Sequence, residues 1–211
     1  MSFENALSYL ALGDSYTVGE GVTGGETWTS RMILRLRDQG ISISFPRVIA
    51  TTGWTCDELS AAMDTAMPPL EPTYDLVSLL IGVNDQYRSY PRDEYVERFS
   101  GLLDRAISLA QGRADRVLVL SIPDWSVTPF ASALEPARDL HAIAEDIDIY
   151  NATAQRICES RGVAFVDHSH ISRELSALPQ NLTSDQLHPG SAVYDAWAEL
   201  AAPVAARLLS S

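Results

Sequence analysis

The chain has 211 residues, of which 46% are hydrophobic and 20% are charged, and its formal net charge is −13. This length suits a single domain over residues 1–211, and the composition is that of a globular protein rather than a disordered, fibrous or membrane-spanning one. The negative charge disfavours nucleic acids and anionic membrane surfaces as partners, because both repel an acidic chain at long range.

Short apolar runs alternate with longer helical patterns along the chain. The apolar runs predict strands at 7–12, 43–50, 76–82, 116–123 and 163–167. The helical patterns predict helices at about 26–38, 56–66, 92–110, 139–161 and 190–209. Continuous apolar strands indicate a sheet that is buried on both faces, and strand–helix alternation indicates parallel pairing. We therefore expect an α/β fold with a doubly wound parallel sheet.

The sequence also carries signals about location. Its first apolar run leads directly into Gly13-Asp14-Ser15 with no basic segment before it, which argues against a cleaved signal peptide. Two cysteines, Cys56 and Cys158, make no disulfide framework and agree with a reducing compartment. No apolar stretch approaches the roughly 20 residues that cross a bilayer. We expect a cytoplasmic protein without stable membrane association.

Four polar motifs follow the ends of predicted strands. They read "GDS" at 13–15, "TTGWT" at 51–55, "GVND" at 82–85 and "PDW" at 123–125. Parallel sheets bind ligands at the carboxyl ends of their strands. The motifs therefore predict one site at that edge of the sheet.

Ser15 is a candidate nucleophile. A serine hydroxyl needs a base within hydrogen-bond reach, and the base needs a third group to orient it. His188 in "SDQLHPG" offers the base, and Asp185 is close enough to bond one imidazole nitrogen and leave the other for the Ser15 proton. The alternative is an ordinary loop pair, with Asp185 or Ser191 as a helix cap.

The other histidines point less directly to chemistry. His141 belongs to the polar first turns of a predicted helix, and His168 and His170 lie in "DHSH" after a strand. An Asp-His-x-His sequence without a distant third ligand is a weak metal motif. We therefore expect no metal.

Acyl transfer also needs hydrogen-bond donors aimed at the developing oxyanion. The candidates are the backbone N–H of Ser15, the backbone N–H of Gly53, where a missing side chain allows close approach, and the side-chain amide of Asn84. Each has a plainer alternative, since Gly53 also suits a simple turn and Asn84 an Asx-turn.

Taken together, the motifs resemble the SGNH (GDSL-type) hydrolases, named for Ser, Gly, Asn and His in four sequence blocks. The blocks here read "ALGDSYTVGEG", "TTGWT", "IGVND" and "SDQLHPG", in the family's order and spacing along residues 10–190. Tyr16 stands where the family's GDSL name has Leu. The resemblance implies a flavodoxin-like three-layer α/β/α sandwich with a five-stranded parallel sheet.

The resemblance also implies a serine esterase that needs no cofactor. Ser15 would be the nucleophile, His188 the general base and Asp185 its orienting partner. Ser15, Gly53 and Asn84 would supply the oxyanion hole.

The substrate stays open, because the family includes carboxylesterases, lysophospholipases, thioesterases and carbohydrate acetylesterases. Four aromatic residues near the motifs either line a pocket or pack against helices: Tyr16, Trp54, Tyr87 and Trp125. Since no long apolar lid is visible, we expect a small soluble ester with a short acyl group. An acetylated saccharide is the nearest rival, and the oligomeric state stays open. Arg88, close to Asn84, is interpreted as a surface charge.

An alternative of a different class is a flavin-binding, flavodoxin-like electron carrier. The first loop has the glycines and hydroxyls that bind a phosphate. Asn84 and the Asp185–His188 pair have no purpose in such a site, and Asp14 would repel a phosphate. The sequence therefore favours the esterase.

Overall fold

Five parallel strands form the sheet in the computed structural model, which describes residues 6–134 and 137–210. The strands are β1 (Tyr9–Gly13), β2 (Arg47–Ala50), β3 (Leu76–Leu80), β4 (Val117–Leu120) and β5 (Ala164–Val166). Their order is β2-β1-β3-β4-β5, which is the flavodoxin-like order, and the predicted parallel sheet is confirmed.

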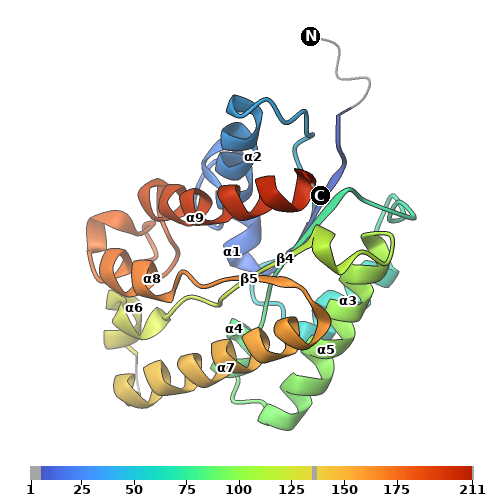
Figure 1. Ribbon diagram of the computed structural model, residues 1–211. Helices are drawn as coiled ribbons and strands as arrows, with labels where there is room; N and C mark the ends of the chain where they lie inside the picture. The colour runs from blue at the N-terminus through green and yellow to red at the C-terminus, as the bar shows by residue number, and fades with distance from the viewer. Residues whose placement is uncertain (1–5, 135–136, 211) are drawn as a thin grey trace.

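Long helices cover both faces of the sheet (Figure 1). They are α2 (Trp28–Asp38), α3 (Cys56–Asp64), α5 (Arg92–Leu109), α7 (Leu140–Arg161) and α9 (Ser191–Ser210), each within two residues of its predicted bounds. Helices α2 and α9 pack together on one face, while α3, α5 and α7 lie side by side on the other. The predicted three-layer sandwich is therefore confirmed.

Several short helices were not predicted from the sequence. The α-helices are α1 (Ser15–Val18), α4 (Val83–Tyr87), α6 (Pro129–Ser132) and α8 (Ser169–Ser176). The 3-10 helices are η1 (Gly24–Glu26), η2 (Ala114–Arg116), η3 (Trp125–Val127) and η4 (Pro179–Asn181). One or two turns are too short to show a hydrophobic period.

The three inner strands form the centre of the core. All residues of β1, β3 and β4 are buried, whereas the edge strands β2 and β5 are partly exposed. This explains the continuous apolar runs of the sequence, because an inner parallel strand has a helix layer on each side. The polar atoms in this centre are paired, since the Tyr9 hydroxyl and Ser78 Oγ lie 2.8 Å apart.

Each inner strand is followed by a short helix on the carboxyl edge, directly after β1 and β3 and after a short loop in the case of β4. Asp14 caps α1 by accepting the Tyr16 N–H at 3.0 Å, and Asp124 caps η3 in the same way. Gly82 begins α4 with a φ of 120°, and a Cβ there would lie 2.8 Å from the ring of Tyr95. These abrupt strand-to-helix turns bring the motif side chains to one edge.

Candidate active site

A serine, a histidine and an aspartate form a hydrogen-bonded chain at the carboxyl edge of the sheet. Ser15 is the first residue of α1, and its Oγ lies 2.9 Å from Nε2 of His188. Nδ1 of His188 lies 2.6 Å from Oδ2 of Asp185. Ser15 and His188 are only 4% and 7% exposed, so this contact is largely shielded from water. The structure thus brings together three residues that the sequence analysis selected.

The loop before α9 is organised by the carboxylate of Asp185. Its Oδ1 accepts the backbone N–H groups of Leu187 and His188 and the hydroxyl of Thr183. Gln186 adopts a left-handed φ of 59° inside this loop. Burial acts to raise the pKa of Asp185, but the hydrogen bonds from His188, Leu187 and Thr183 outweigh it and hold the pKa well below its usual range.

The ionised carboxylate of Asp185 decides which nitrogen of the His188 imidazole carries the proton. A carboxylate at Nδ1 of His188 holds the proton on that nitrogen, so that Nε2 offers its lone pair to Ser15. The ring of Tyr16 lies 5.3 Å from the imidazole, centroid to centroid, and the ring of Trp197 lies behind Tyr16 at 6.1 Å. These packed rings restrict the movement of the histidine.

Three residues expected to supply hydrogen-bond donors line one cavity: Ser15, Gly53 and Asn84. The N–H of Ser15 is in the first turn of α1, whose donors have no partner within the helix. Gly53 lines the same cavity with a φ of 86°, a conformation that strains other residues. Asn84 also lines it, and one N–H of its amide donates to the Trp54 carbonyl at 2.9 Å. An amide has a second N–H.

A cavity of about 200 Å³ lies beside these groups. Most of its wall is apolar, and its polar lining comes from the serine, histidine and donor residues already described together with one threonine. Tyr16 also lines the cavity, and the remaining lining residues are Thr52, Val83, Tyr87, Trp125, Phe130 and Leu187. The site therefore combines a nucleophile–base pair with a small apolar chamber, as ligand sites usually do.

Two buried carboxyl groups lie beneath the site without lining the cavity. Burial raises the pKa of Asp14 to about 8, and it raises that of Asp85 to about 6. Asp85 Oδ2 accepts the backbone N–H of Cys56 at 3.0 Å. Asp14 thus caps α1 after β1, and Asp85 connects α4 to the start of α3.

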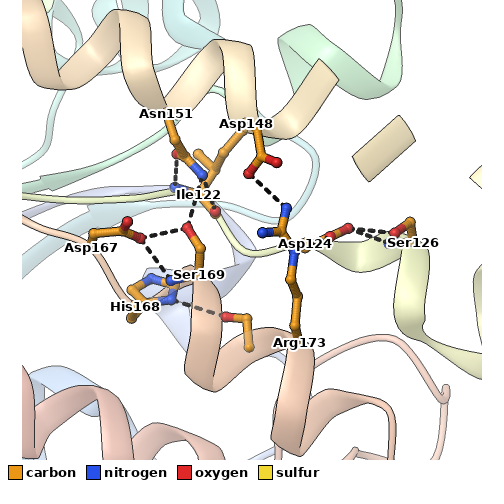
Figure 2. Close-up of polar contacts among 10 residues, drawn as sticks. Ile122, Asp124, Ser126, Asp148, Asn151, Asp167, His168, Ser169 and Arg173 are labelled. Carbon is orange, nitrogen blue, oxygen red and sulfur yellow. Dashed lines mark hydrogen bonds and ion pairs between the residues drawn. The ribbon is translucent and has the colours of Figure 1, made fainter. Parts of the chain in front are cut away.

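The loop after β4 carries one aromatic wall of the cavity and is held by an ion pair between a buried carboxylate and a partly exposed arginine (Figure 2). Arg173 of α8 donates through Nε to Asp124 at 2.8 Å and through Nη2 to Asp148 at 2.6 Å. Asp124, only 1% exposed, also accepts the N–H and hydroxyl of Ser126. The next residue, Trp125, donates through its indole N–H to Gln86 at 2.9 Å.

In the "DHSH" segment, the side chains of Asp167 and His168 form hydrogen bonds with serine side chains (Figure 2). Asp167 accepts from Ser169, as Figure 2 shows. His168 is bonded to Ser172 and stacked on the ring of Trp197. Burial lowers the pKa of His168 to about 4, so this imidazole is neutral. Nowhere in residues 6–134 and 137–210 do three His, Cys, Asp or Glu side chains gather to hold a metal ion.

Sequence comparison identifies the family of the chain that carries this site. Residues 11–196 match the GDSL-like lipase/acylhydrolase family. The chain belongs to this family. Membership makes it an ester hydrolase of the SGNH type. No curated protein matches it by sequence.

Solved structures similar to this GDSL-family chain share its fold over nearly their whole length. TesA has a TM-score of 0.71 at 17% identity, covering 95% of this chain and 99% of its own. The psychrotrophic esterase EstA from Pseudoalteromonas sp. has a TM-score of 0.69 at 15% identity, covering 97% of this chain and 99% of its own. Axe2, an acetylxylan esterase from Geobacillus stearothermophilus, has a TM-score of 0.63 at 21% identity, covering 100% of this chain and 97% of its own.

Three of the four selected aromatic residues line the cavity of this GDSL-family chain. Tyr16, Tyr87 and Trp125 do so, whereas Trp54 follows the other alternative and does not line it. The Trp54 side chain packs against the core, and only its carbonyl serves the site by accepting from Asn84.

Other parts of the site were missed. Leu187 lies within the "SDQLHPG" block and Phe130 follows the "PDW" motif, and their apolar character near motif residues was the available signal. Arg88 is exposed, in agreement with its interpretation as a surface charge, and its guanidinium also donates to the Gly53 carbonyl at 2.6 Å, a contact that the sequence did not reveal.

The flavin-carrier alternative does not fit this GDSL-family chain. The carboxyl group of Asp14 occupies the start of α1, where a phosphate would have to bind, and accepts the N–H of Tyr16.

Across the described part of the chain, no helix combines the length and hydropathy of a membrane-spanning segment.

Proposed function

We propose that the protein hydrolyses small carboxylic esters through an acyl-enzyme on Ser15. The observation that carries the proposal is the chain of two hydrogen bonds, 2.9 Å from Ser15 Oγ to His188 Nε2 and 2.6 Å from His188 Nδ1 to Asp185 Oδ2. A weak nucleophile, an oriented base and an ionised partner in contact are the requirements for nucleophilic catalysis by serine.

In the first half-reaction, Oγ of Ser15 attacks the ester carbonyl carbon while Nε2 of His188 takes the hydroxyl proton. The carbonyl oxygen becomes an oxyanion that the N–H groups of Ser15 and Gly53 and the amide of Asn84 stabilise. The carbon–oxygen bond to the alcohol then breaks, and the imidazolium returns its proton to the leaving alkoxide. Asp185 stabilises the imidazolium throughout.

In the second half-reaction, water attacks the acyl carbon of the Ser15 ester. His188 takes one proton from this water through Nε2, and the same three donors hold the second oxyanion. Collapse breaks the bond to Oγ, releases the carboxylic acid and returns the proton to Ser15. No other reactant is required.

The cavity favours a short acyl group. An apolar cavity of 150 Å³ holds one benzene molecule, and the cavity here measures about 200 Å³. Trp125, the largest aromatic residue in the wall, is 2% exposed and offers little open ring face for a sugar. An acetylated saccharide would therefore enter with its acetyl group alone, leaving the sugar outside.

The decisive experiment is hydrolysis of p-nitrophenyl acetate, butyrate and octanoate by the wild type and by Ser15→Ala. Removing the serine of a triad enzyme costs about 10⁶ in rate, so the variant should be inactive against all three. The wild type should prefer the two shorter esters. Full activity of Ser15→Ala would remove this serine from the mechanism, and a preference for octanoate would contradict the short-acyl assignment.

A further inference from the structure

Helix α4 and its C-cap residue bind two consecutive carbonyl groups in the 51–55 loop. Nη2 of Arg88 donates to the carbonyl of Gly53 at 2.6 Å. The amide of Asn84, one helical turn earlier, donates to the carbonyl of Trp54 at 2.9 Å. Both contacts connect the segment after β3 to the segment after β2.

The same guanidinium also binds the start of α3. Nη1 of Arg88 lies 3.2 Å from Oε1 of Glu58. The other oxygen of Glu58 accepts the backbone N–H of Thr55 at 2.9 Å and its hydroxyl at 3.0 Å. Arg88 is thus linked to both ends of the short segment that follows Gly53.

Gly53 needs external support because its backbone is intrinsically flexible. It has no side chain to pack, and its φ of 86° is one of several conformations that glycine adopts freely. Its N–H and its carbonyl belong to two peptide planes that meet at the Cα. A bond that fixes the carbonyl plane limits rotation at the Cα, and therefore limits the directions in which the N–H can point.

We propose that Arg88 is a positioning residue for the oxyanion hole, holding the N–H of Gly53 toward the Ser15 hydroxyl. The inference rests on the proposed function, because it takes Gly53 as a donor in catalysis. Arg88 does not line the cavity, so it acts through Gly53 rather than on the substrate. A guanidinium suits this task, since its planar fork binds a carbonyl and a carboxylate together.

The test compares Arg88→Ala and Arg88→Lys with the wild type on p-nitrophenyl acetate. Loss of a whole oxyanion donor costs about 10²–10³ in kcat, so a donor that is present but misdirected should cost about tenfold. We expect Arg88→Ala to lower kcat about tenfold with KM within twofold. Lysine, which keeps the charge and one donor, should recover part of the loss.

A second readout separates positioning from general loosening of the fold. Butylboronic acid forms a tetrahedral adduct with an active serine and mimics the oxyanion state. Its inhibition constant should rise in Arg88→Ala by the same factor by which kcat/KM falls, because both report binding of the tetrahedral state. A higher KM with unchanged kcat, or unchanged boronate inhibition, would overturn the proposal.

The chain offers a matched control in Arg105. This arginine also donates to a backbone carbonyl, that of Ser60, and pairs with a carboxylate, Asp64, but at the far end of α3. Arg105→Ala should keep wild-type kcat, and an equal loss in both variants would contradict a specific role for Arg88. Ser15→Ala keeps the two proposals apart: if it is inactive while Arg88→Ala is fully active, only the role of Arg88 fails.

Discussion

Two carboxyl groups close to Ser15 in the fold are held in opposite protonation states. Asp185 accepts hydrogen bonds from an imidazole, two backbone N–H groups and a hydroxyl, which keep its pKa low. Asp14 accepts the backbone N–H of Tyr16 on one oxygen, and burial raises its pKa to about 8. The contrast follows from the number of donors that each side chain meets, since burial alone favours the neutral acid.

The raised pKa of Asp14 predicts how stability changes with pH. Its pKa of about 8 in the folded state lies above the value of about 3.9 in an unfolded chain. Between these values the folded protein binds more protons than the unfolded one, so this group's contribution to stability is lost as pH rises. Asp14→Asn keeps an acceptor oxygen for Tyr16 but has no proton to lose.

The variant should therefore become more stable relative to the wild type as pH increases. Urea unfolding at pH 5, 6, 7 and 8 should show the difference growing by up to about 1.4 kcal/mol per pH unit. Asp38→Asn makes the same substitution at an exposed position and serves as the control. Parallel stability profiles for the wild type and Asp14→Asn would contradict the raised pKa.

At the residue scale, the sequence selected side chains that carry their own chemistry. Ser15, Asp185 and His188 were selected because a hydroxyl, a carboxylate and an imidazole in this order suit acyl transfer, and the structure brings them into contact. The contact of Arg88 was not predicted, because its partner is the backbone carbonyl of Gly53. Every residue has such a carbonyl, so no sequence pattern marks the one that an arginine will bind.

At the scale of elements, the loop after β4 depends on a buried carboxylate. Asp124 is 1% exposed, whereas its partner Arg173 is 36% exposed. Removing the arginine leaves a buried carboxylate without its cation. Neutralising the aspartate leaves an arginine that is still hydrated and still paired with Asp148. Loss of one partner of a buried pair costs more when the remaining charge is the buried one.

Arg173→Met should therefore destabilise the protein more than Asp124→Asn does. Leaving a buried polar group unsatisfied costs about 1–3 kcal/mol, and more for a charged group. Asparagine still accepts the N–H of Ser126, so η3 should persist in Asp124→Asn. Chemical unfolding of both variants measures the difference, and Asp148→Asn, which removes only the exposed partner, should be nearly neutral. The reverse order of stabilities would refute this account of the pair.

For the shortest helices, length decided that the sequence did not reveal them. The five long helices repeat an apolar face over several turns, and their bounds were predicted to within two residues. Helix α4 has five residues and α6 has four, so neither completes two turns. Their positions depend on tertiary contacts, such as the ring of Tyr95 against Gly82.

At the scale of the whole molecule, the cavity is assembled by the sheet edge from segments that are distant in sequence. The sequence predicted that four motifs would meet at this edge, because parallel strands all end there. It did not predict which side chains would face inward, since that depends on how each loop leaves its strand. Trp54 and Phe130 illustrate the limit: the first turns toward the core, and the second lines the cavity.

Phe130 connects two of these distant segments and sets the size of the chamber. Its ring lines the cavity, while its backbone N–H donates to the carbonyl of Gln186 in the loop that carries His188. Because this tether uses the backbone, Phe130→Ala removes the ring and keeps the connection. The variant should therefore retain the Ser15–His188 contact while the chamber gains the space of a phenyl group.

Phe130→Ala should shift the preference toward longer acyl chains. One methylene in an apolar pocket changes kcat/KM by about 10–200-fold, so the ratio of kcat/KM for p-nitrophenyl octanoate to that for acetate should rise at least about tenfold. Phe45→Ala removes the same ring from an exposed position before β2 and should leave the ratio unchanged. If Phe130→Ala also leaves it unchanged, the acyl group does not occupy this chamber, and the leaving alcohol would be the part of the substrate that the apolar wall receives.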